Sequence, residues 1–389
     1  MQRDAGKDIE LDIEGVAQYL DIPISRLQRL LDKRELLQNW GEYQHLFRFE
    51  TTFSHIESGT VVYQKDGSFE LIKGFPKIKR AMLLEPAINF HFSDIDTVCV
   101  EEKMNGFNVR AITLDGKIVA ITRGGYVCPY STEKARDLLN IDFFNENPEL
   151  VLHGEMAGPD NPYVPKNIYD IDSLDFFVFD IRHKGSGEPL PVKERRDLAE
   201  EYGFTQVRLF GEFAKEEAPS KIRDIITELG KIGHEGVVIK DPDMNIQPIK
   251  YTCSQSNCAD LRHAFRFYND VGRDYLFSRV VREGFQAFEW GESEEDLKKR
   301  CLQLGESILN PMVEAINDMG KGERVAEEVQ IRIKSLETLE KFKEYLRRQG
   351  IDTMFYEPER VGDEFLVRIK KLNKSTNDKT LSMFKGELW

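Results

Sequence analysis

The first forty residues carry two apolar stripes at the spacing of a helix. The apolar residues recur every three or four positions, and they are Ile13, Val16, Ala17, Leu20, Leu27, Leu30, Leu31 and Leu37. Asp21-Ile22-Pro23 separates the stripes, and Ser25 is expected to cap the second helix. The pattern predicts two short helices that pack on a core, a far commoner use of such a pair than binding DNA.

The hydrophobic period then changes to two. Between about residues 47 and 127 apolar and polar positions alternate, which predicts strands. Asp66-Gly67 and Asp115-Gly116 interrupt the alternation, and both dipeptides favour tight hairpin turns because glycine tolerates positive φ. Further strands are predicted at 150–155, 175–181 and 235–240, with helices at 131–139, 193–202 and 220–229. Strands joined by hairpins and mixed with helices predict an α+β fold with antiparallel sheet.

The C-terminal third has two patterns. From residue 259 to 319 the apolar spacing is helical, with a break predicted at Pro311, and residues 319–322 resemble a linker. Strand, helix, strand and strand are then predicted over 328–334, 336–348, 352–357 and 364–371. We therefore predict four domains, which cover residues 1–64, 65–258, 259–319 and 320–389.

Composition and charge narrow the classes of function. The length of 389 residues exceeds that of one ordinary domain. A net charge of −14 disfavours wrapping duplex DNA by a global positive field, although a local basic cleft remains open. No apolar run reaches the ~20 residues of a membrane span, and the N-terminal residues lack the apolar core of a secretory signal. Five scattered cysteines do not form a disulfide framework, so we expect a reducing, cytoplasmic location.

Two familiar nucleotide and metal motifs are absent or incomplete. Nothing matches the P-loop spacing, and Gly185-Ser186-Gly187 is followed by Glu188-Pro189 instead of a helix. Cys253, Cys258 and His263 are separated by four residues each, but no fourth zinc ligand lies nearby. Buried or free thiols are therefore the favoured interpretation of these cysteines.

Six short segments carry the remaining polar chemistry, and they are 102–108, 122–125, 153–156, 176–180, 235–240 and 249–252. In chain order they supply an amine, an arginine, a carboxylate, an aromatic strand, a carboxylate with a lysine, and a further lysine. Taken singly, each has a commoner structural interpretation, because strand-end charges are usually solvated and aromatic runs are usually core. Their fixed order in one chain indicates a single site.

These segments resemble motifs I, Ia, III, IIIa, IV and V of the covalent nucleotidyltransferases, the superfamily of ATP-dependent ligases and mRNA capping enzymes. The wider text is similar to the ATP-dependent RNA ligases first recognised in archaea, at residues 74–80, 101–110, 121–125, 154–159 and 250–252. Two positions depart from the family pattern. Asn105 replaces the acidic residue of Lys-x-Asp-Gly, and Pro248 stands where many relatives have the first lysine of Lys-x-Lys.

The resemblance implies a fold and a reaction. It implies an antiparallel-sheet nucleotidyltransferase core over 65–258, an N-terminal α/β extension, a helical dimerisation region over 259–319 and a small α/β C-terminal domain. Relatives join or circularise single-stranded RNA as homodimers, so the expected partners are RNA ends and a second copy of the chain. The expected activity is that of an RNA ligase using ATP, which joins 5′-phosphate and 3′-hydroxyl ends through lysyl–AMP and adenylylated RNA.

Lys103 would be the nucleophile that attacks the α-phosphorus of ATP. A lysine in water has a pKa of ~10.4, so neutralising it at pH 7 costs about 4.6 kcal/mol. Neighbouring cations lower a lysine pKa, whereas bare carboxylates raise it. By the resemblance, Glu155 and Glu235 would hold Mg²⁺ or Mn²⁺ beside the phosphates, which would present positive charge to Lys103.

The resemblance also assigns residues to the anionic groups. Lys240 and Lys250 would contact the α-phosphate, and Arg123 would hold phosphate or ribose by its rigid fork. Because every substrate is anionic, the cleft must be basic although the protein is acidic. The candidates for a local basic patch that binds RNA are Lys77, Lys79 and Arg80.

Four further residues would contact the base or the RNA. Phe179 would stack on adenine, with Phe177 as the alternative on the same strand face. Glu102 would accept a hydrogen bond from the adenine amino group. Asn108 would serve the final sealing step on the RNA ends.

Three other functions stay open. A DNA ligase or a capping guanylyltransferase would share the same motifs, but DNA ligases of this chemistry normally carry an oligonucleotide-binding barrel after motif V. The text after Thr252 is helical, which argues against both. A non-catalytic RNA-binding relative is the third alternative, and the presence of Lys103, Glu155, Glu235 and Lys240 argues against it.

Overall fold

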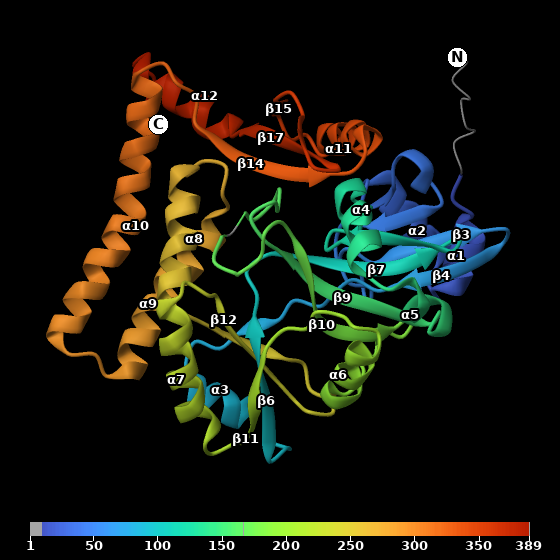
Figure 1. Ribbon diagram of the computed structural model, residues 1–389, viewed down its shortest axis with the longest axis horizontal. Helices are drawn as coiled ribbons and strands as arrows, with labels where there is room; N and C mark the ends of the chain where they lie inside the picture. Colours follow the sequence, from blue (N-terminus) through green and yellow to red (C-terminus); the bar gives the residue numbers. More distant parts are fainter. Residues whose placement is uncertain (1–9, 166, 389) are drawn as a thin grey trace.

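The computed structural model describes residues 10–165 and 167–388. In these residues the strands form four sheets, and Figure 1 shows helices around them. Almost every strand pair is antiparallel, and the parallel pair of β13 with β5 lies at the edge of one sheet. The predicted α+β class is therefore confirmed. None of the described helices is both long and apolar enough to cross a bilayer.

The N-terminal part combines two helices with a sheet of order β1-β2-β3-β4. Its elements are α1 (Ile13–Tyr19), α2 (Ile24–Asp32), β1 (Leu36–Gln38), η1 (Gly41–Tyr43), β2 (Leu46–Phe49), β3 (Val61–Lys65) and β4 (Ser68–Ile72). The predicted cap at Ser25 is wrong, because α2 begins at Ile24 directly after Pro23, whose fixed φ favours a first turn. Leu37 lies in β1 and not in a helix. The boundary predicted at residue 64 falls inside β3, so this sheet extends to Ile72.

Both predicted hairpins are present. Asp66 and Gly67 join β3 to β4 with φ values of 49° and 77°. Asp115 and Gly116 join β7 to β8 with φ values of 50° and 71°. Positive φ at both central residues is the geometry whose twist suits a two-residue hairpin.

Two central sheets occupy the middle of the chain. The first has the order β10-β9-β7-β8, and its strands are β7 (Phe107–Leu114), β8 (Lys117–Thr122), β9 (Leu150–Ala157) and β10 (Asp175–His183). The second has the order β11-β6-β12-β13-β5, and its strands are β5 (Lys79–Arg80), β6 (Thr97–Lys103), β11 (Leu209–Ala214), β12 (Gly236–Lys240) and β13 (Ile249–Thr252).

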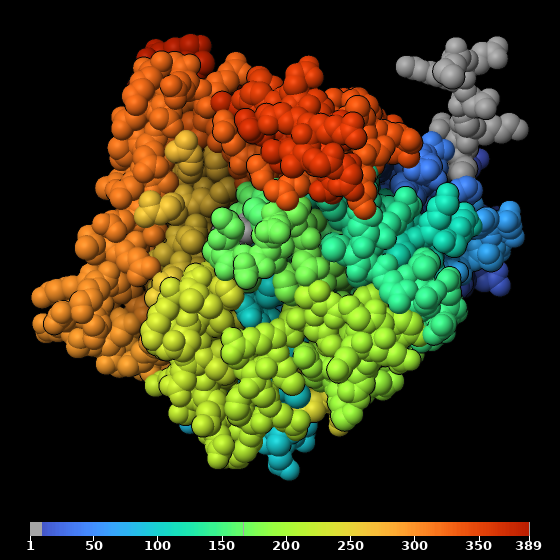
Figure 2. All heavy atoms as spheres, in the orientation of Figure 1, coloured from blue at the N-terminus to red at the C-terminus, as the bar shows by residue number. Residues whose placement is uncertain are grey.

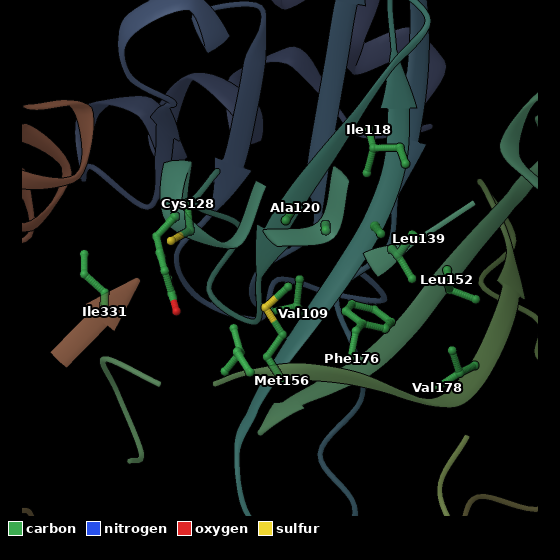
Figure 3. Packing of buried hydrophobic residues seen from close by; sticks show 14 of the residues in the cluster. Val109, Ile118, Ala120, Cys128, Leu139, Leu152, Met156, Phe176, Val178 and Ile331 are labelled. Carbon is green, nitrogen blue, oxygen red and sulfur yellow. The ribbon is translucent and has the colours of Figure 1, made fainter. Parts of the chain in front are cut away.

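Each central sheet buries its own apolar core. Residues of α4 (Pro129–Leu138), α5 (Ile141–Glu146) and α6 (Val192–Glu201) share a core with the first sheet. Figure 3 shows Val109, Leu152, Phe176 and Val178 of that core. Residues of α3 (Leu84–His91) and α7 (Ala218–Lys231) share a core with the second sheet.

The chain passes from the second central sheet to the first between Lys103 and Phe107. Lys103 is the last residue of β6, and Phe107 is the first residue of β7. Gly106 lies in this crossing, where an added Cβ would approach the Met156 carbonyl oxygen to 2.2 Å. Only glycine fits so close to a neighbouring strand, which explains why Gly106 stands three residues after the lysine.

Three long helices follow the central sheets. They are α8 (Ser254–Arg266), α9 (Arg273–Trp290) and α10 (Glu294–Gly320). The boundary predicted at residue 258 falls inside α8. The predicted break at Pro311 is wrong, because α10 continues through this buried proline. Packing of α10 along α8 offsets the main-chain hydrogen bond that proline cannot make.

The C-terminal part forms a small sheet of order β14-β17-β15, with β16 also paired to β17. Its elements are β14 (Ala326–Ile333), α11 (Leu336–Arg348), β15 (Thr353–Phe355), β16 (Glu359–Val361), β17 (Glu364–Leu372) and α12 (Lys374–Phe384). Ile331 and Phe342 belong to the same core as Met156 of the first central sheet, and Figure 3 shows Ile331 near that core. Figure 2 shows the C-terminal atoms lying directly against the central part.

Candidate active site

A cavity of about 810 Å³ lies where β6 ends and the chain crosses between the two central sheets. All six segments singled out in the sequence contribute to its lining. Six further lining residues, which the sequence did not place at the site, come from α8, α9 and the C-terminal part, and they are Asp260, His263, Tyr275, Glu327, Tyr345 and Gln349. The cavity therefore brings together side chains from residue 75 to residue 349.

Lys103 lies beside a carboxylate in this cavity. Its Nζ donates a hydrogen bond to Oε2 of Glu235 at 2.7 Å. The two side chains are 21% and 15% exposed, so both remain accessible from the cavity. Gly236 pairs with Lys103 across β12 and β6, which places Glu235 at the same end of the sheet.

A second carboxylate shares this environment. Glu155 of β9 pairs with Asn108 of β7 and with Phe177 of β10. Burial, together with the nearby Glu235, raises the pKa of Glu155 to about 7, although Lys103 opposes the shift. Burial would lower the pKa of Lys103, but Glu235 and Glu155 outweigh it and raise that pKa above its ordinary value. The bare site therefore holds the amine protonated.

Glu155 and Glu235 suit a hard divalent cation. Mg²⁺ is usually held by one or two carboxylates together with substrate phosphates and water, and not by a cage of protein ligands. The described residues contain no cluster of three or more His, Cys, Asp or Glu side chains arranged for a metal. Two carboxylates on the cavity wall match that donor set, and Mn²⁺ accepts the same ligands.

Further cations face Lys103. Lys250 of β13 pairs with Val238, and burial together with Lys103 lowers the pKa of Lys250 to about 8. Arg80 of β5 pairs with Lys250 and donates to Oδ1 of Asn257 at 3.4 Å. Burial lowers the pKa of Arg80 as well. Lys250 thus places positive charge next to the predicted nucleophile, and Arg80 lies behind it, beside Lys250.

One of the three residues of the predicted basic patch lines the cavity. Lys77 is exposed and contributes to the lining, whereas Lys79 and Arg80 do not. Lys79 is exposed, and Arg80 is half-buried near Lys250. Lys79 and Arg80 point to opposite faces of β5 because side chains alternate along a strand. Binding of RNA by these residues stays a prediction.

Arg123 follows β8 and lines the cavity. An added Cβ on Gly59 would approach the Arg123 carbonyl oxygen to 1.9 Å, so the N-terminal part packs closely against this turn. The sequence assigned no role to Arg110, which is fully buried and donates to the carbonyls of Gly59 at 2.6 Å and Thr122 at 3.1 Å. Arg110 thus joins the N-terminal part to the strand that ends just before Arg123.

Phe179 lines the cavity, whereas Phe177 does not contribute to the lining. The register of β10 against β9 shifts between Val178 and Asp180, so Phe179 is the additional residue of a β-bulge. Its ring stands edge-on to Phe75 with centroids 5.2 Å apart. Because of the bulge, the period of two does not hold along this strand. Phe177 and Phe179 therefore differ, and Phe179 forms the aromatic wall of the cavity.

Lys240 lines the cavity and is also held by Glu101 and Phe179. Its Nζ lies 2.7 Å from Oε2 of Glu101 and donates to the Phe179 carbonyl at 2.7 Å. The Lys240 side chain is 5% exposed, and burial lowers its pKa. Its contact with the α-phosphate stays a prediction. The sequence assigned no role to Glu101. Its position two residues before Lys103 on β6 was the available signal, because residues two apart on a strand lie on the same face.

Glu102 and Asn108 differ in their hydrogen bonding. Oε1 of Glu102 lies 2.5 Å from Nδ1 of His234, and this hydrogen bond raises the pKa of His234. His234, which directly precedes Glu235 in the sequence, was not predicted to lie at the site. Oδ1 of Asn108 is buried and has no hydrogen-bond partner among the described residues. Because Asn108 lines the cavity, this oxygen is available to a bound substrate.

Comparisons with known proteins identify the family of the chain. The family model described as RNA ligase matches residues 96–252, and the model described as Ligase Pab1020 C-terminal region matches residues 263–387. A curated relative, the uncharacterised protein MJ0414 of Methanocaldococcus jannaschii, is 40% identical over 97% of each chain.

Solved structures extend the similarity over the whole chain. Two forms of an archaeal ATP-dependent RNA ligase are 42% identical, with a TM-score of 0.91 over 98% of this chain and 100% of theirs. A candidate ATP-dependent DNA ligase from Aquifex aeolicus is 26% identical, with a TM-score of 0.87 over 94% of this chain and 100% of its own.

The raised pKa of Glu155 gives the stability a defined pH dependence. An unfolded Glu155 loses its proton near pH 4.5, whereas the folded one keeps it to about pH 7. The folded state therefore binds the extra proton in this window, and the free energy of unfolding falls as the pH rises through it. Glu155→Gln removes the titration, so its thermal midpoint should rise relative to wild type between pH 4.5 and pH 7, measured without metal. A difference that stays constant across this range would contradict the assignment.

Proposed function

Because the chain belongs to the family of archaeal ATP-dependent RNA ligases, we propose that it joins RNA ends using ATP. The observation that carries the proposal is the Lys103 amine, 2.7 Å from Glu235 in a cavity that Glu155 and Lys250 also line. This constellation supplies a nucleophile, a carboxylate pair for a divalent cation and a cation for phosphate. Formation of a phosphodiester bond by an RNA ligase requires all three.

The reaction proceeds in three steps, of which the first two transfer the adenylyl group and the third releases it as AMP. Nζ of Lys103 attacks the α-phosphorus of ATP, the bond to the bridging oxygen breaks, and pyrophosphate leaves. A 5′-phosphate oxygen of RNA then attacks the same phosphorus, the bond between that phosphorus and Nζ breaks, and the free Lys103 is regenerated with the adenylyl group attached to RNA. In the last step a 3′-hydroxyl attacks the RNA phosphate and AMP departs. Each step conserves the number of phosphoryl groups.

The first transfer requires Lys103 to lose its proton. Its pKa is raised in the bare site, so the carboxylates must be neutralised before the amine gains a lone pair. A divalent cation bound by Glu155 and Glu235 would offset their charge and that of the phosphates. Lys250 adds positive charge beside the amine and also favours its neutral form.

The remaining cavity residues receive roles by their positions. Lys250 contacts the α-phosphate, where charge grows during transfer. Arg123 holds phosphate or ribose, and Phe179 stacks on the base. Glu102, oriented by His234, accepts from the adenine amino group, and the free oxygen of Asn108 serves the sealing step.

The first test is covalent labelling. Incubation with ATP radiolabelled at the α-phosphate should leave acid-stable label on wild-type protein and none on Lys103→Ala, because the adenylyl group is attached through that amine. Lys117→Ala is the control, since Lys117 is exposed at the start of β8 and does not line the cavity. Absence of label from wild type would leave a non-catalytic RNA-binding protein as the answer.

The second test separates RNA from DNA. The 26% identity to the candidate DNA ligase keeps DNA sealing as the second candidate function. The helices α8 to α10 follow β13 in the place where a DNA ligase of this chemistry has its barrel, so we expect RNA sealing. Single-stranded 5′-phosphorylated RNA and its DNA counterpart should be compared at equal concentration, and RNA should be sealed at least about tenfold faster, about 1.4 kcal/mol in the barrier. Equal or faster sealing of DNA would contradict the RNA assignment.

We also propose that the chain is a homodimer. Leu302, Leu309, Val313 and Ile316 of α10 follow helical spacing and are 65%, 59%, 45% and 41% exposed. On α9, Phe277 and Phe288 are 71% and 77% exposed. Such a concentration of exposed apolar side chains is typical of an interface, and a second copy supplies an identical apolar face.

Light scattering tests the oligomeric state. Wild type should have the mass of two chains, and Leu302→Glu combined with Phe288→Glu should have the mass of one, because burying two carboxylates in an apolar interface is unfavourable. Lys193→Glu, at an exposed position of α6, which contributes none of these side chains, should remain dimeric. A monomeric wild type would contradict the proposal.

A further inference from the structure

The bulge at Phe179 leaves a main-chain oxygen that the ladder does not pair. Phe179 is the extra residue of β10, between Val178 opposite Gly154 and Asp180 opposite His153. Its carbonyl accepts one hydrogen bond from Nζ of Lys240 and one from Nη1 of Arg195, each at 2.7 Å. Two charged donors on a single carbonyl are more than a buried oxygen requires for satisfaction.

The two donors are held together by one buried carboxylate. Glu101 forms ion pairs with both Arg195 and Lys240, and the three side chains are 1%, 1% and 5% exposed. Burial would raise the pKa of Glu101, but Lys240 and Arg195 outweigh it and lower that pKa to about 2. Without Glu101, two like charges would meet at the Phe179 carbonyl, so the carboxylate is what allows the double contact.

The cluster links four elements around the cavity. Glu101 belongs to β6, Lys240 to β12, Arg195 to α6 and Phe179 to β10. Glu101 is two residues before Lys103 on the same strand, so one rigid strand carries both the nucleophile and the anchor of the aromatic wall. The distance between the amine and the aromatic wall is thereby fixed through β6.

We propose that Glu101, Arg195 and Lys240 form a positioning cluster that fixes the main chain at Phe179 and so holds its ring in place for the base of ATP. The inference rests on the proposed function, in which Phe179 stacks on adenine. The cluster contacts neither the phosphates nor the reacting atoms. It acts on ATP through Phe179, and it accounts for Lys240 without an α-phosphate contact.

A merely structural role predicts a different result from a positioning role. A structural cluster would lower the folded fraction and leave the ATP affinity of the folded protein unchanged. A phosphate-binding Lys240 would weaken every polyphosphate ligand equally. A positioning cluster weakens only the ligand that carries a base, because only the base touches Phe179.

Arg195→Lys tests this difference in the full chain. The variant keeps the positive charge but loses the fork that reaches Phe179 and Glu101 together. We expect the KM for ATP in lysyl–AMP formation to rise about tenfold, the loss of one charge-assisted hydrogen bond, while kcat changes less than about threefold. The inhibition constant of inorganic tripolyphosphate, which has no base, should stay within about twofold of wild type.

Four further variants complete the experiment. Lys193→Ala, at an exposed position of α6, controls for substitution in that helix. Combining Arg195→Lys with Phe179→Ala should raise the KM no further than Phe179→Ala alone, because both changes remove the same ordered ring. Lys240→Arg replaces Arg195→Lys if the latter does not fold, and the same results are expected from it.

Two results would overturn the inference while the proposed function stands. One is an unchanged KM for ATP in Arg195→Lys protein that still forms the lysyl–AMP adduct. The other is an inhibition constant for tripolyphosphate that rises as much as the KM for ATP, which would indicate that Lys240 or Arg195 contacts the phosphates. Failure of wild type to form the adduct at all would instead remove the proposed function.

Discussion

The chemistry of the site depends on the charge balance around one amine. Glu235 accepts a hydrogen bond from Lys103, and with Glu155 it raises the pKa of that lysine. A protonated amine has no lone pair, so this charge balance opposes attack by Lys103. In the proposed function, the same two carboxylates would bind a divalent cation. Binding of the metal and nucleotide would then also favour loss of the proton from the amine, and Lys250 contributes to the same balance.

The backbone places this amine by close approaches that tolerate no side chain. At Gly106 the chain crosses between the two central sheets, and an added Cβ there would lie 2.2 Å from the Met156 carbonyl oxygen. At Gly59 the N-terminal sheet approaches the carbonyl of Arg123 in the same manner. The buried Arg110 guanidinium donates hydrogen bonds to the carbonyls of both Gly59 and Thr122. The N-terminal part thus positions Arg123, although it supplies no residue of the motifs.

The sequence predicted the features that depend on neighbours along the chain. The hairpins at Asp115 and at Asp66 and the α+β class follow from local turn chemistry and from hydrophobic period, and the structure contains them. The errors at Ser25 and Leu37 are local, since both concern where the second helix begins and ends. Other features depend on contacts between distant residues. The continuity of α10 through Pro311 depends on packing along α8. The ion pair of Lys240 with Glu101 joins two strands that no spacing in the sequence brings together. The family resemblance located the motif residues but not the partners that orient them.

The C-terminal part is a wall of the site as well as a separate sheet. Tyr345 is 2% exposed within the core that joins this part to the first central sheet, and it also lines the cavity. Buried ion pairs reinforce the contact, since Lys134 lies 2.7 Å from Glu364 and Arg332 lies 3.2 Å from Asp160. Because the same residue serves the core and the cavity, separating the C-terminal part would expose apolar surface and open the site together. The shape of the cavity around Lys103 is therefore a property of the whole chain and not of the two central sheets alone.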